Sequence, residues 1–148
     1  IGGLFIALGE RALPILERRG LFENEASPVD QRHLLQALRF CWEYPSDTVP
    51  RTEVILITRK LLPVPHLTRE VIVDLSRYQD WDFRNQIVAT WDTLGGEGPL
   101  IRPAIVGYLL ACPSEKGASL LAHLRGKNIE LFEKAQQAAA IPFPAAAP

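Results

Sequence analysis

Apolar residues recur every three or four positions along most of the chain, and the clearest case is the stretch 80–112. Its first half places apolar side chains on one helical face, namely Phe83, Ile87, Val88, Trp91 and Leu94. Its second half carries a broader apolar stripe, formed by Leu100, Ile101, Ala104, Ile105, Tyr108, Leu109 and Cys112. This spacing is typical of one face of an α-helix. The stretch therefore predicts two consecutive helices.

Polar residues, glycine and proline mark the ends of these two helices. We expect Asp80 or Asp82 to cap the first helix, because a carboxylate at that position accepts from free backbone N–H groups. Gly95 and Gly96 are expected to end it with positive φ, and Pro99 is expected to begin the next helix. The short connection predicts a hairpin of two antiparallel helices.

The same spacing predicts helices along the rest of the chain. Residues 4–8 are expected to form the end of a helix. Further helices are expected to span 10–19, 28–44, 49–62, 66–78, 114–125 and 128–140. An alternative for the first two is one long helix kinked at Pro14. The expected N-caps are Ser27, Asp47 or Thr48, Ser114 and Asn128. Because no stretch alternates apolar and polar residues between hairpin turns, the sequence predicts an all-α fold of about seven or eight antiparallel helices.

Composition limits the domain organisation and the class of partner. The chain has 148 residues, of which 47% are hydrophobic and 22% charged, as in an ordinary globular domain. We expect one domain over residues 1–140, followed by a proline- and alanine-rich tail at 141–148 that is extended and poorly ordered. The formal net charge is −1. Such a chain has no global field that would gather nucleic acid or anionic lipid.

The apolar runs are too short to cross a bilayer, so we expect a soluble protein without a membrane anchor. The sequence begins IGGLFIALGE, with no basic region before its short apolar run. It therefore does not predict a signal peptide. The absent initiating methionine indicates a fragment, or a C-terminal part, of a longer protein. The compartment is not assigned.

Two parts of the chain repeat one pattern, in which a Leu-Gly pair ends a helix and a proline follows inside the next helix. They lie at 7–16 and 93–106. The first, ALGERALPIL, resembles the helix junction of bacterial HEAT-like repeats, and Asp80-Trp81-Asp82-Phe83-Arg84 is similar to the turn of that family. The resemblance covers 7–16 and 80–106, whereas residues 27–78 contain no such turn. It implies a right-handed α-α superhelix, a HEAT-like solenoid, in which Asp80 or Asp82 caps a helix and Arg84 packs in a ladder between repeats.

Residues that carry chemistry are scattered. The three histidines, His33, His66 and His123, fall on different predicted helices, and no paired spacing typical of zinc ligands occurs. The glycines at 95–98 and 126 lack the pattern of a phosphate-binding loop, and no Gly-x-Ser-x-Gly elbow is present. Cys41 and Cys112 lie in apolar patterns and are expected to be buried thiols. We therefore expect no catalytic residues, no metal ligands and no cofactor.

The tryptophans are the remaining candidates for binding. Trp91 belongs to an inward stripe and is expected in the core, whereas Trp81 lies in an Asp-Trp-Asp turn and is expected to be partly exposed. Loop aromatics are common binding residues, so Trp81, Asp82 and Arg84 form the predicted binding site. The alternative is that Trp81 packs as a staple against a neighbouring helix.

The leading prediction is a non-catalytic helical-repeat interaction module that binds a protein partner through its concave face. The alternative is a nucleic-acid-binding HEAT-like domain similar to the alkylpurine glycosylases, in which a basic concave cleft holds DNA. It rests on the basic residues that dominate the N-terminal half, namely Arg11, Arg18, Arg19, Arg32, Arg39, Arg51, Arg59, Lys60, Arg69 and Arg77.

Overall fold

A computed structural model describes residues 12–113 and 115–139. Over these ranges the chain forms eight α-helices and one short 3-10 helix, with no strand, which confirms the all-α prediction. Every helix in these ranges is too short or too polar to span a membrane. The chain divides into two compact units at Tyr78 and Gln79. The single domain over 1–140 stays a prediction, and the tail at 141–148 lies outside the described residues.

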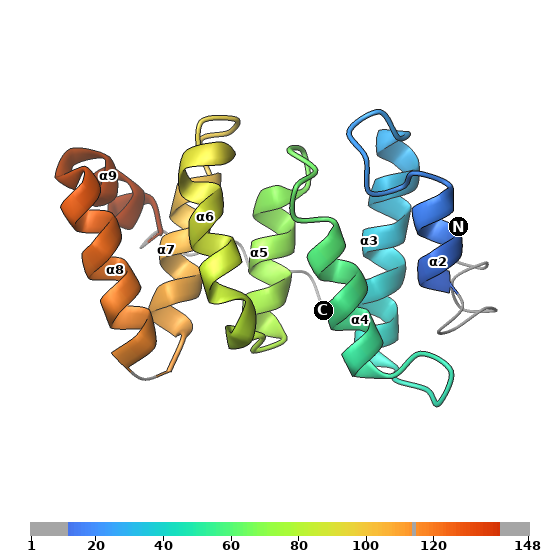
Figure 1. Cartoon of the computed structure of the whole chain (residues 1–148). Helices are drawn as coiled ribbons and strands as arrows, with labels where there is room; N and C mark the ends of the chain where they lie inside the picture. Colours follow the sequence, from blue (N-terminus) through green and yellow to red (C-terminus); the bar gives the residue numbers. More distant parts are fainter. Residues whose placement is uncertain (1–11, 114, 140–148) are drawn as a thin grey trace. The chain divides into compact units, whose positions relative to one another are not determined.

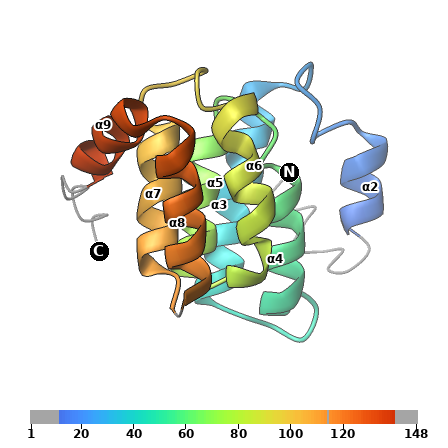
Figure 2. The same cartoon turned by 60° about the vertical axis from the view of Figure 1, so that its left-hand side comes forward.

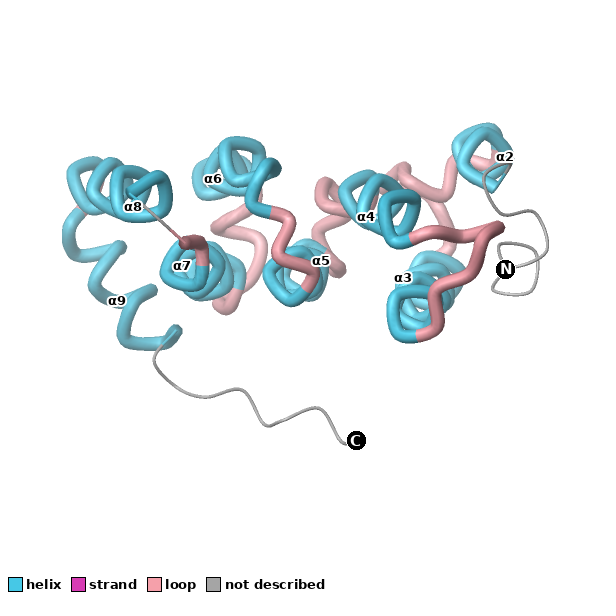
Figure 3. Tube along the Cα trace, turned by 90° about the horizontal axis from the view of Figure 1, so that it is seen from below, coloured by secondary structure: helices cyan, strands magenta, loops and turns pink. Residues whose placement is uncertain are grey.

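The first unit contains four described helices. They are α2 (Ala12–Arg18), α3 (Pro28–Glu43), α4 (Arg51–Lys60) and α5 (Thr68–Arg77). Within this unit, α2 and α4 lie in one layer and α3 and α5 in the other (Figure 3). Gly20 follows α2 with a φ of 67°, a conformation that favours glycine, and so ends the helix. The helix end predicted at 4–8 lies outside the described residues.

Helix α3 follows directly from its sequence. The Ser27 hydroxyl accepts from the backbone N–H of Asp30 at 3.4 Å, which confirms the predicted cap, and Pro28 occupies the first turn. One face of α3 is buried, through Leu34, Leu35, Leu38 and Cys41. Trp42, near the end of the helix, is half-buried. This apolar face packs against α4.

Four side-chain pairs join α3 to α5 or to the residues that flank it, His66 before the helix and Tyr78 at its end. They are Gln31 with His66, Arg32 with Glu70, Arg39 with Asp74, and Trp42 with Tyr78. Both members advance in the same direction along the chain, so the two helices run parallel, and the residues joined are between 35 and 38 positions apart. We call this set the α3–α5 ladder. In this set, the number of positions that separates the two members of a pair is nearly constant.

The second unit is built around α7. It contains the 3-10 helix η2 (Trp81–Phe83), then α6 (Arg84–Thr93), α7 (Ile101–Ala111), α8 (Glu115–Lys127) and α9 (Ile129–Ala139). Helix α7 contacts α6, α8 and α9 (Figures 1 and 2). It is buried on most sides as a result, through Ile101, Pro103, Ala104, Ile105, Val106, Tyr108 and Leu109. The predicted apolar stripe is thus confirmed, except that Leu100 is exposed.

The predicted N-cap of α6 is wrong, whereas its predicted end is right in position but not in backbone conformation. Neither Asp80 nor Asp82 caps this helix, because η2 precedes it and no side chain caps its first turn. Gly95 and Gly96 do not have positive φ. Space, and not φ, requires glycine at 95: a Cβ atom there would lie 2.2 Å from the carbonyl oxygen of Trp91.

Other predicted boundaries shift by a few residues. Helix α4 begins at Arg51 after Pro50, and not at a side-chain cap on Asp47 or Thr48. The Ser46 hydroxyl instead accepts from the N–H of Val49 at 3.1 Å and closes the preceding loop.

The last two helices meet at Asn128. The predicted cap by Asn128 on α9 is confirmed, because its Oδ1 accepts from the N–H of Leu131 at 3.0 Å. Gly126 and Lys127, which lie between the two predicted helices at 114–125 and 128–140, belong to α8. Ile129, the first residue of α9, is exposed. The cap predicted at position 114 lies outside the described residues.

Candidate partner-binding surface

The predicted site around Trp81 is held by contacts within the second unit. The indole of Trp81 is half-buried and lies edge-on against the ring of Tyr108, with 5.1 Å between the centroids. The hydroxyl of Tyr108 donates to the carbonyl of Asp80. Trp81 is therefore partly exposed, as predicted, and its turn is anchored to α7.

The neighbouring predicted residues take different roles. Nη1 of Arg84 donates to the carbonyl of Trp81 at 3.0 Å, a hydrogen bond within the turn itself. Asp82 is exposed. The structure thus brings Trp81 and Arg84 together, while a ladder role for Arg84 and a binding role for these three residues stay predictions.

The histidines and cysteines occupy ordinary environments. His33, His66 and His123 are exposed, and His66 Nε2 lies 2.8 Å from Oε1 of Gln31. In residues 12–113 and 115–139, no group of three His, Cys, Asp or Glu side chains is arranged to hold a metal ion. Cys41 and Cys112 are buried free thiols, as predicted, and burial raises the pKa of Cys41.

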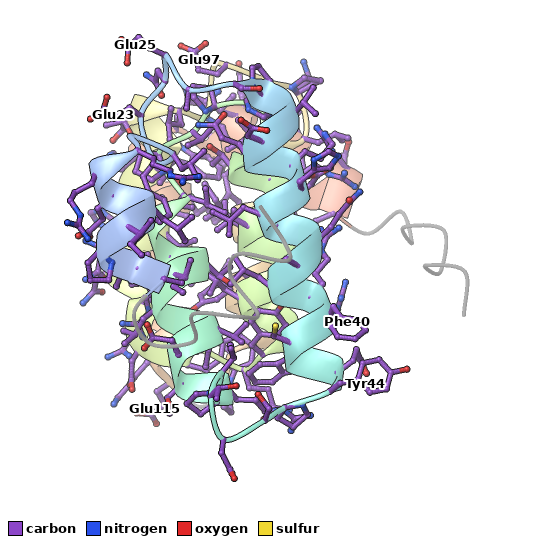
Figure 4. All side chains as sticks on the ribbon, turned by 90° about the vertical axis from the view of Figure 1, so that its right-hand side faces the viewer. Glu23, Glu25, Phe40, Tyr44, Glu97 and Glu115 are labelled. Carbon is purple, nitrogen blue, oxygen red and sulfur yellow. The ribbon has the colours of Figure 1, made fainter. Side chains whose placement is uncertain are left out.

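An exposed stripe runs along one face of α3, and we call it the α3 stripe. Its members follow one another at intervals of three or four residues, so they share one helical face: Val29, His33, Gln36, Phe40 and Tyr44. Val29 is 60% exposed, Phe40 53% and Tyr44 68%. Phe40 and Tyr44 project from the same side of α3 near its end (Figure 4). Three large apolar side chains in one line thus face solvent.

The end of α3 carries two separate aromatic contacts, one at the exposed pair and one at Trp42. The rings of Phe40 and Tyr44 lie 4.9 Å apart, tilted by 40°. The guanidinium of Arg51 lies 4.6 Å from the centre of the Trp42 ring, and its Nε donates to the Trp42 carbonyl at 3.0 Å. Trp42 in turn stacks on Tyr78. The contacts of Trp42 hold the C-terminal end of α3, where Phe40 and Tyr44 lie.

The opposite end of the stripe borders a shallow hollow. The hollow has a volume of about 210 Å³ and is lined by Pro28, Val29, Arg32, His33, Gln36 and His66. Gln31 contacts one of these lining residues: its amide nitrogen donates to the carbonyls of Leu21 and Glu23, and its Oε1 lies 2.8 Å from Nε2 of His66. The α3 stripe therefore offers a raised aromatic pair at one end and a recess at the other.

The charges beside the stripe are largely neutralised by ion pairs. Arg32 pairs with Glu70 at 3.2 Å, and Arg39 pairs with Asp74 at 2.7 Å. The Asp74 carboxylate is fully buried, and Arg77 lies 3.5 Å from its other oxygen. These pairs leave little free positive charge along this face.

Burial governs the titration of the buried part of the ladder. The pKa of Asp74 is raised, because desolvation outweighs the attraction of Arg39 and Arg77. Burial alone would lower the pKa of Arg39, but the hydrogen bond and charge of Asp74 raise it. Burial also raises the pKa of the Tyr78 hydroxyl, which has no hydrogen-bond partner among residues 12–113 and 115–139. Tyr78 therefore stays neutral throughout the physiological range.

The exposed aromatic pair was not among the residues expected from sequence. Phe40 and Tyr44 fall outside the inward set Leu34, Leu38 and Cys41 of the same helix. A second line of apolar residues at helical spacing, off the inward face, was the available signal. Whether such a second line of apolar residues belongs to a binding surface or to the core depends on which elements cover it, and the local sequence does not say this.

Comparisons of the chain with protein-family models, with curated proteins and with solved structures found no match.

Proposed function

We propose that the chain is a non-catalytic helical-repeat module that binds a protein partner through the α3 stripe. The observation that carries the proposal is the pair of exposed, adjacent rings of Phe40 and Tyr44 on a supported helix end. Aromatic side chains lose little conformational entropy on binding and bury much apolar area, and they are enriched among the residues that dominate binding energy.

The remainder of the stripe supports a protein partner of mixed character. His33 and Gln36 separate Val29 from the aromatic pair, so polar groups alternate with apolar ones along the face. A partner segment that places apolar side chains on the rings and polar groups between them would match this order. Single exposed apolar residues are common on protein surfaces, whereas an aligned set at helical spacing is a stronger sign of an interface.

The repeat character is proposed on the basis of sequence offsets. The α3–α5 ladder joins residues 35 to 38 positions apart, and in the second unit Lys127 of α8 pairs with Asp92 of α6, again 35 positions away. Tandem helical hairpins produce such an offset, and those of the solenoid families repeat about every 34 to 47 residues. These offsets support tandem helical hairpins, with a period somewhat shorter than the roughly 40–47 residues of HEAT repeats.

The nucleic-acid alternative receives less support. Of the basic residues on which it rests, Arg32, Arg39, Lys60 and Arg77 pair with carboxylates in the first unit. A paired guanidinium contributes less to the release of counterions from phosphates than a free one. A protein partner is therefore the better-supported class.

A site-specific crosslinking experiment tests the proposal. A photo-crosslinking phenylalanine analogue is placed at Phe40, with a matched copy at Leu56, which is 46% exposed on α4 of the same unit. The expected result is a specific protein adduct at position 40 that is absent at position 56. The identified partner is then purified and its affinity measured.

Alanine substitutions then measure the contribution of the pair. Phe40→Ala and Tyr44→Ala are each expected to weaken the purified complex about tenfold, because truncating an interface aromatic costs more than about 1 kcal/mol. Leu56→Ala is expected to leave the affinity unchanged. Equal crosslinking at both positions, or unchanged affinity after loss of both rings, would reject the α3 stripe as the interface.

A further inference from the structure

The second unit contains a cavity that none of the preceding features explains. It has a volume of about 170 Å³ and lies where the loop after α6, the first turn of α7 and one face of α9 meet. An apolar cavity of about 150 Å³ accommodates a benzene ring in a well-studied protein. The cavity is therefore large enough for one aromatic ring or a branched hydrocarbon group of similar size.

The walls of this cavity are mainly apolar. Pro99 and Pro103 contribute one side, and Leu131, Ala135 and Ala138 contribute the side formed by α9. Small residues on α9 leave the space open, because alanine fills less volume than the larger apolar residues. Such a lining favours a compact hydrocarbon group over a polar one.

Two cations, and no acidic residue, belong to the lining. They are Arg102 of α7 and Lys134 of α9. Nε of Arg102 donates to the carbonyl of Trp91 at 3.2 Å, and the guanidinium lies 5.5 Å from the centre of the Trp91 ring. These contacts fix the guanidinium, while its two terminal nitrogens make no hydrogen bond to the described residues. Lys134 forms no ion pair with the described residues.

The glycine before the cavity helps to hold Arg102 in this position. A Cβ atom at Gly95 would lie 2.6 Å from Nε of Arg102 and 2.2 Å from the Trp91 carbonyl oxygen. Any larger residue would therefore displace the guanidinium or the backbone that it contacts. The absence of a side chain at Gly95 lets Arg102 remain bound to α6 at the edge of the cavity.

We propose that this cavity binds a compact organic carboxylate, whose hydrocarbon part is about the size of one aromatic ring. The ring or branched group lies between the prolines and α9, and the carboxylate meets the terminal nitrogens of Arg102 and the ammonium of Lys134. Hydrogen bonds between charged groups are about twice as strong as neutral ones. An apolar cavity with two cations at its edge favours an anion that also has a hydrocarbon group.

Titration of the isotope-labelled full chain with benzoate, followed by amide chemical shifts, tests this site. We expect a Kd of about 1 mM, as is usual for a ligand of this size. The shifts should centre on Gly95, Gly98, Ala135 and Ala138. Benzyl alcohol, which has the ring without the charge, and acetate, which has the charge without the ring, are each expected to bind at least about tenfold more weakly.

Two variants test separately the contribution of the Lys134 charge and that of the cavity volume to binding. Lys134→Gln is expected to weaken benzoate binding about tenfold, because it removes a charged donor from an exposed position that has no ion pair with the described residues. Lys60→Gln, a lysine of the first unit, is the matched control and should leave binding unchanged. Ala138→Phe fills the cavity and should abolish the shifts, while the rest of the amide spectrum shows whether the variant is folded.

A second probe distinguishes the source of the carboxylate. N-acetylphenylalanine presents the ring and the carboxylate of the last residue of a peptide. If it binds about tenfold more tightly than benzoate, the site takes the free carboxyl terminus of a polypeptide; if benzoate binds more tightly, the site takes a free organic acid. The proposal is overturned if neither probe shifts the cavity amides, if benzyl alcohol binds as tightly as benzoate, or if Lys134→Gln binds benzoate unchanged.

Discussion

The buried ion pair between Arg39 and Asp74 gives the most quantitative prediction for this fold. Replacing Arg39 by methionine keeps a long apolar side chain but removes the charge. The Asp74 carboxylate, which is 0% exposed, then loses its 2.7 Å partner and retains only Arg77 at 3.5 Å. A buried charge that loses its partner is strongly destabilising, because water does not replace the lost interaction.

The size of the effect follows from the geometry. Breaking a fully buried pair costs about 3–5 kcal/mol. The Arg39 side chain is 36% exposed, so part of its interaction is screened by water, and Arg77 remains near Asp74. We therefore expect Arg39→Met to lower the free energy of unfolding by about 2–3 kcal/mol at neutral pH. This corresponds to a fall in Tm of about 5–10 °C.

The cost should depend on pH in a defined direction. Desolvation raises the pKa of Asp74 above its usual value of 3.8, and Arg39 opposes that rise. Removing Arg39 raises the pKa in the folded variant further, while the unfolded value stays the same. A raised pKa of the folded state contributes stability below the unfolded pKa that is lost as pH rises through the folded pKa. The cost of Arg39→Met is therefore smallest in acid and grows toward neutral pH.

Urea unfolding, followed by tryptophan fluorescence at neutral pH and at about pH 4, measures both effects. The matched control is Arg32→Met on the same helix, whose pair with Glu70 is partly exposed; its expected cost is below about 1 kcal/mol. Asp74→Asn should cost less than Arg39→Met, because it removes the buried charge itself. The reasoning is refuted if the cost of Arg39→Met does not change with pH, or if it equals that of Arg32→Met.

Two further substitutions test the packing of the second unit. Gly95→Ala should lower the free energy of unfolding by about 2 kcal/mol, because its Cβ would overlap the Trp91 carbonyl oxygen. Gly96→Ala is the control and should be nearly neutral, because the space around Gly96 is open. Urea unfolding of both variants measures the difference. Tyr108→Phe removes the hydroxyl that donates to the Asp80 carbonyl and should cost about 1–2 kcal/mol by the same assay, and an unchanged midpoint would count against that hydrogen bond.

The sequence predicted helices well where local signals and packing agreed. Ser27 before Pro28 is a strong start signal, and α3 begins there. The caps proposed at Asp80 and Asp82 failed because a 3-10 turn takes the chain into α6, and that turn depends on the contact between Trp81 and Tyr108 across 27 residues. A local pattern contains no information about such a contact.

The candidate sites were less predictable than the helices. Trp81 was identified from its loop position, and its partial exposure is confirmed. Phe40 and Tyr44 were missed, since whether an apolar residue on a second helical face is covered depends on elements far away in the chain. The cavity beside Arg102 arises from three segments that meet only in the folded unit. Its two cations are 32 positions apart and form no motif.

The α3–α5 ladder has a consequence for register. Aliphatic side chains can exchange partners when one helix slides past another by a turn, and the buried area then changes little. Hydrogen-bonded and stacked pairs tolerate no such slip, and the ladder contains four of them with nearly the same offset. A slip of one turn between α3 and α5 would break every rung together and leave Asp74 buried beside the wrong residue. The ladder thus specifies a single register between α3 and α5, much as a buried polar residue selects the register of a coiled coil.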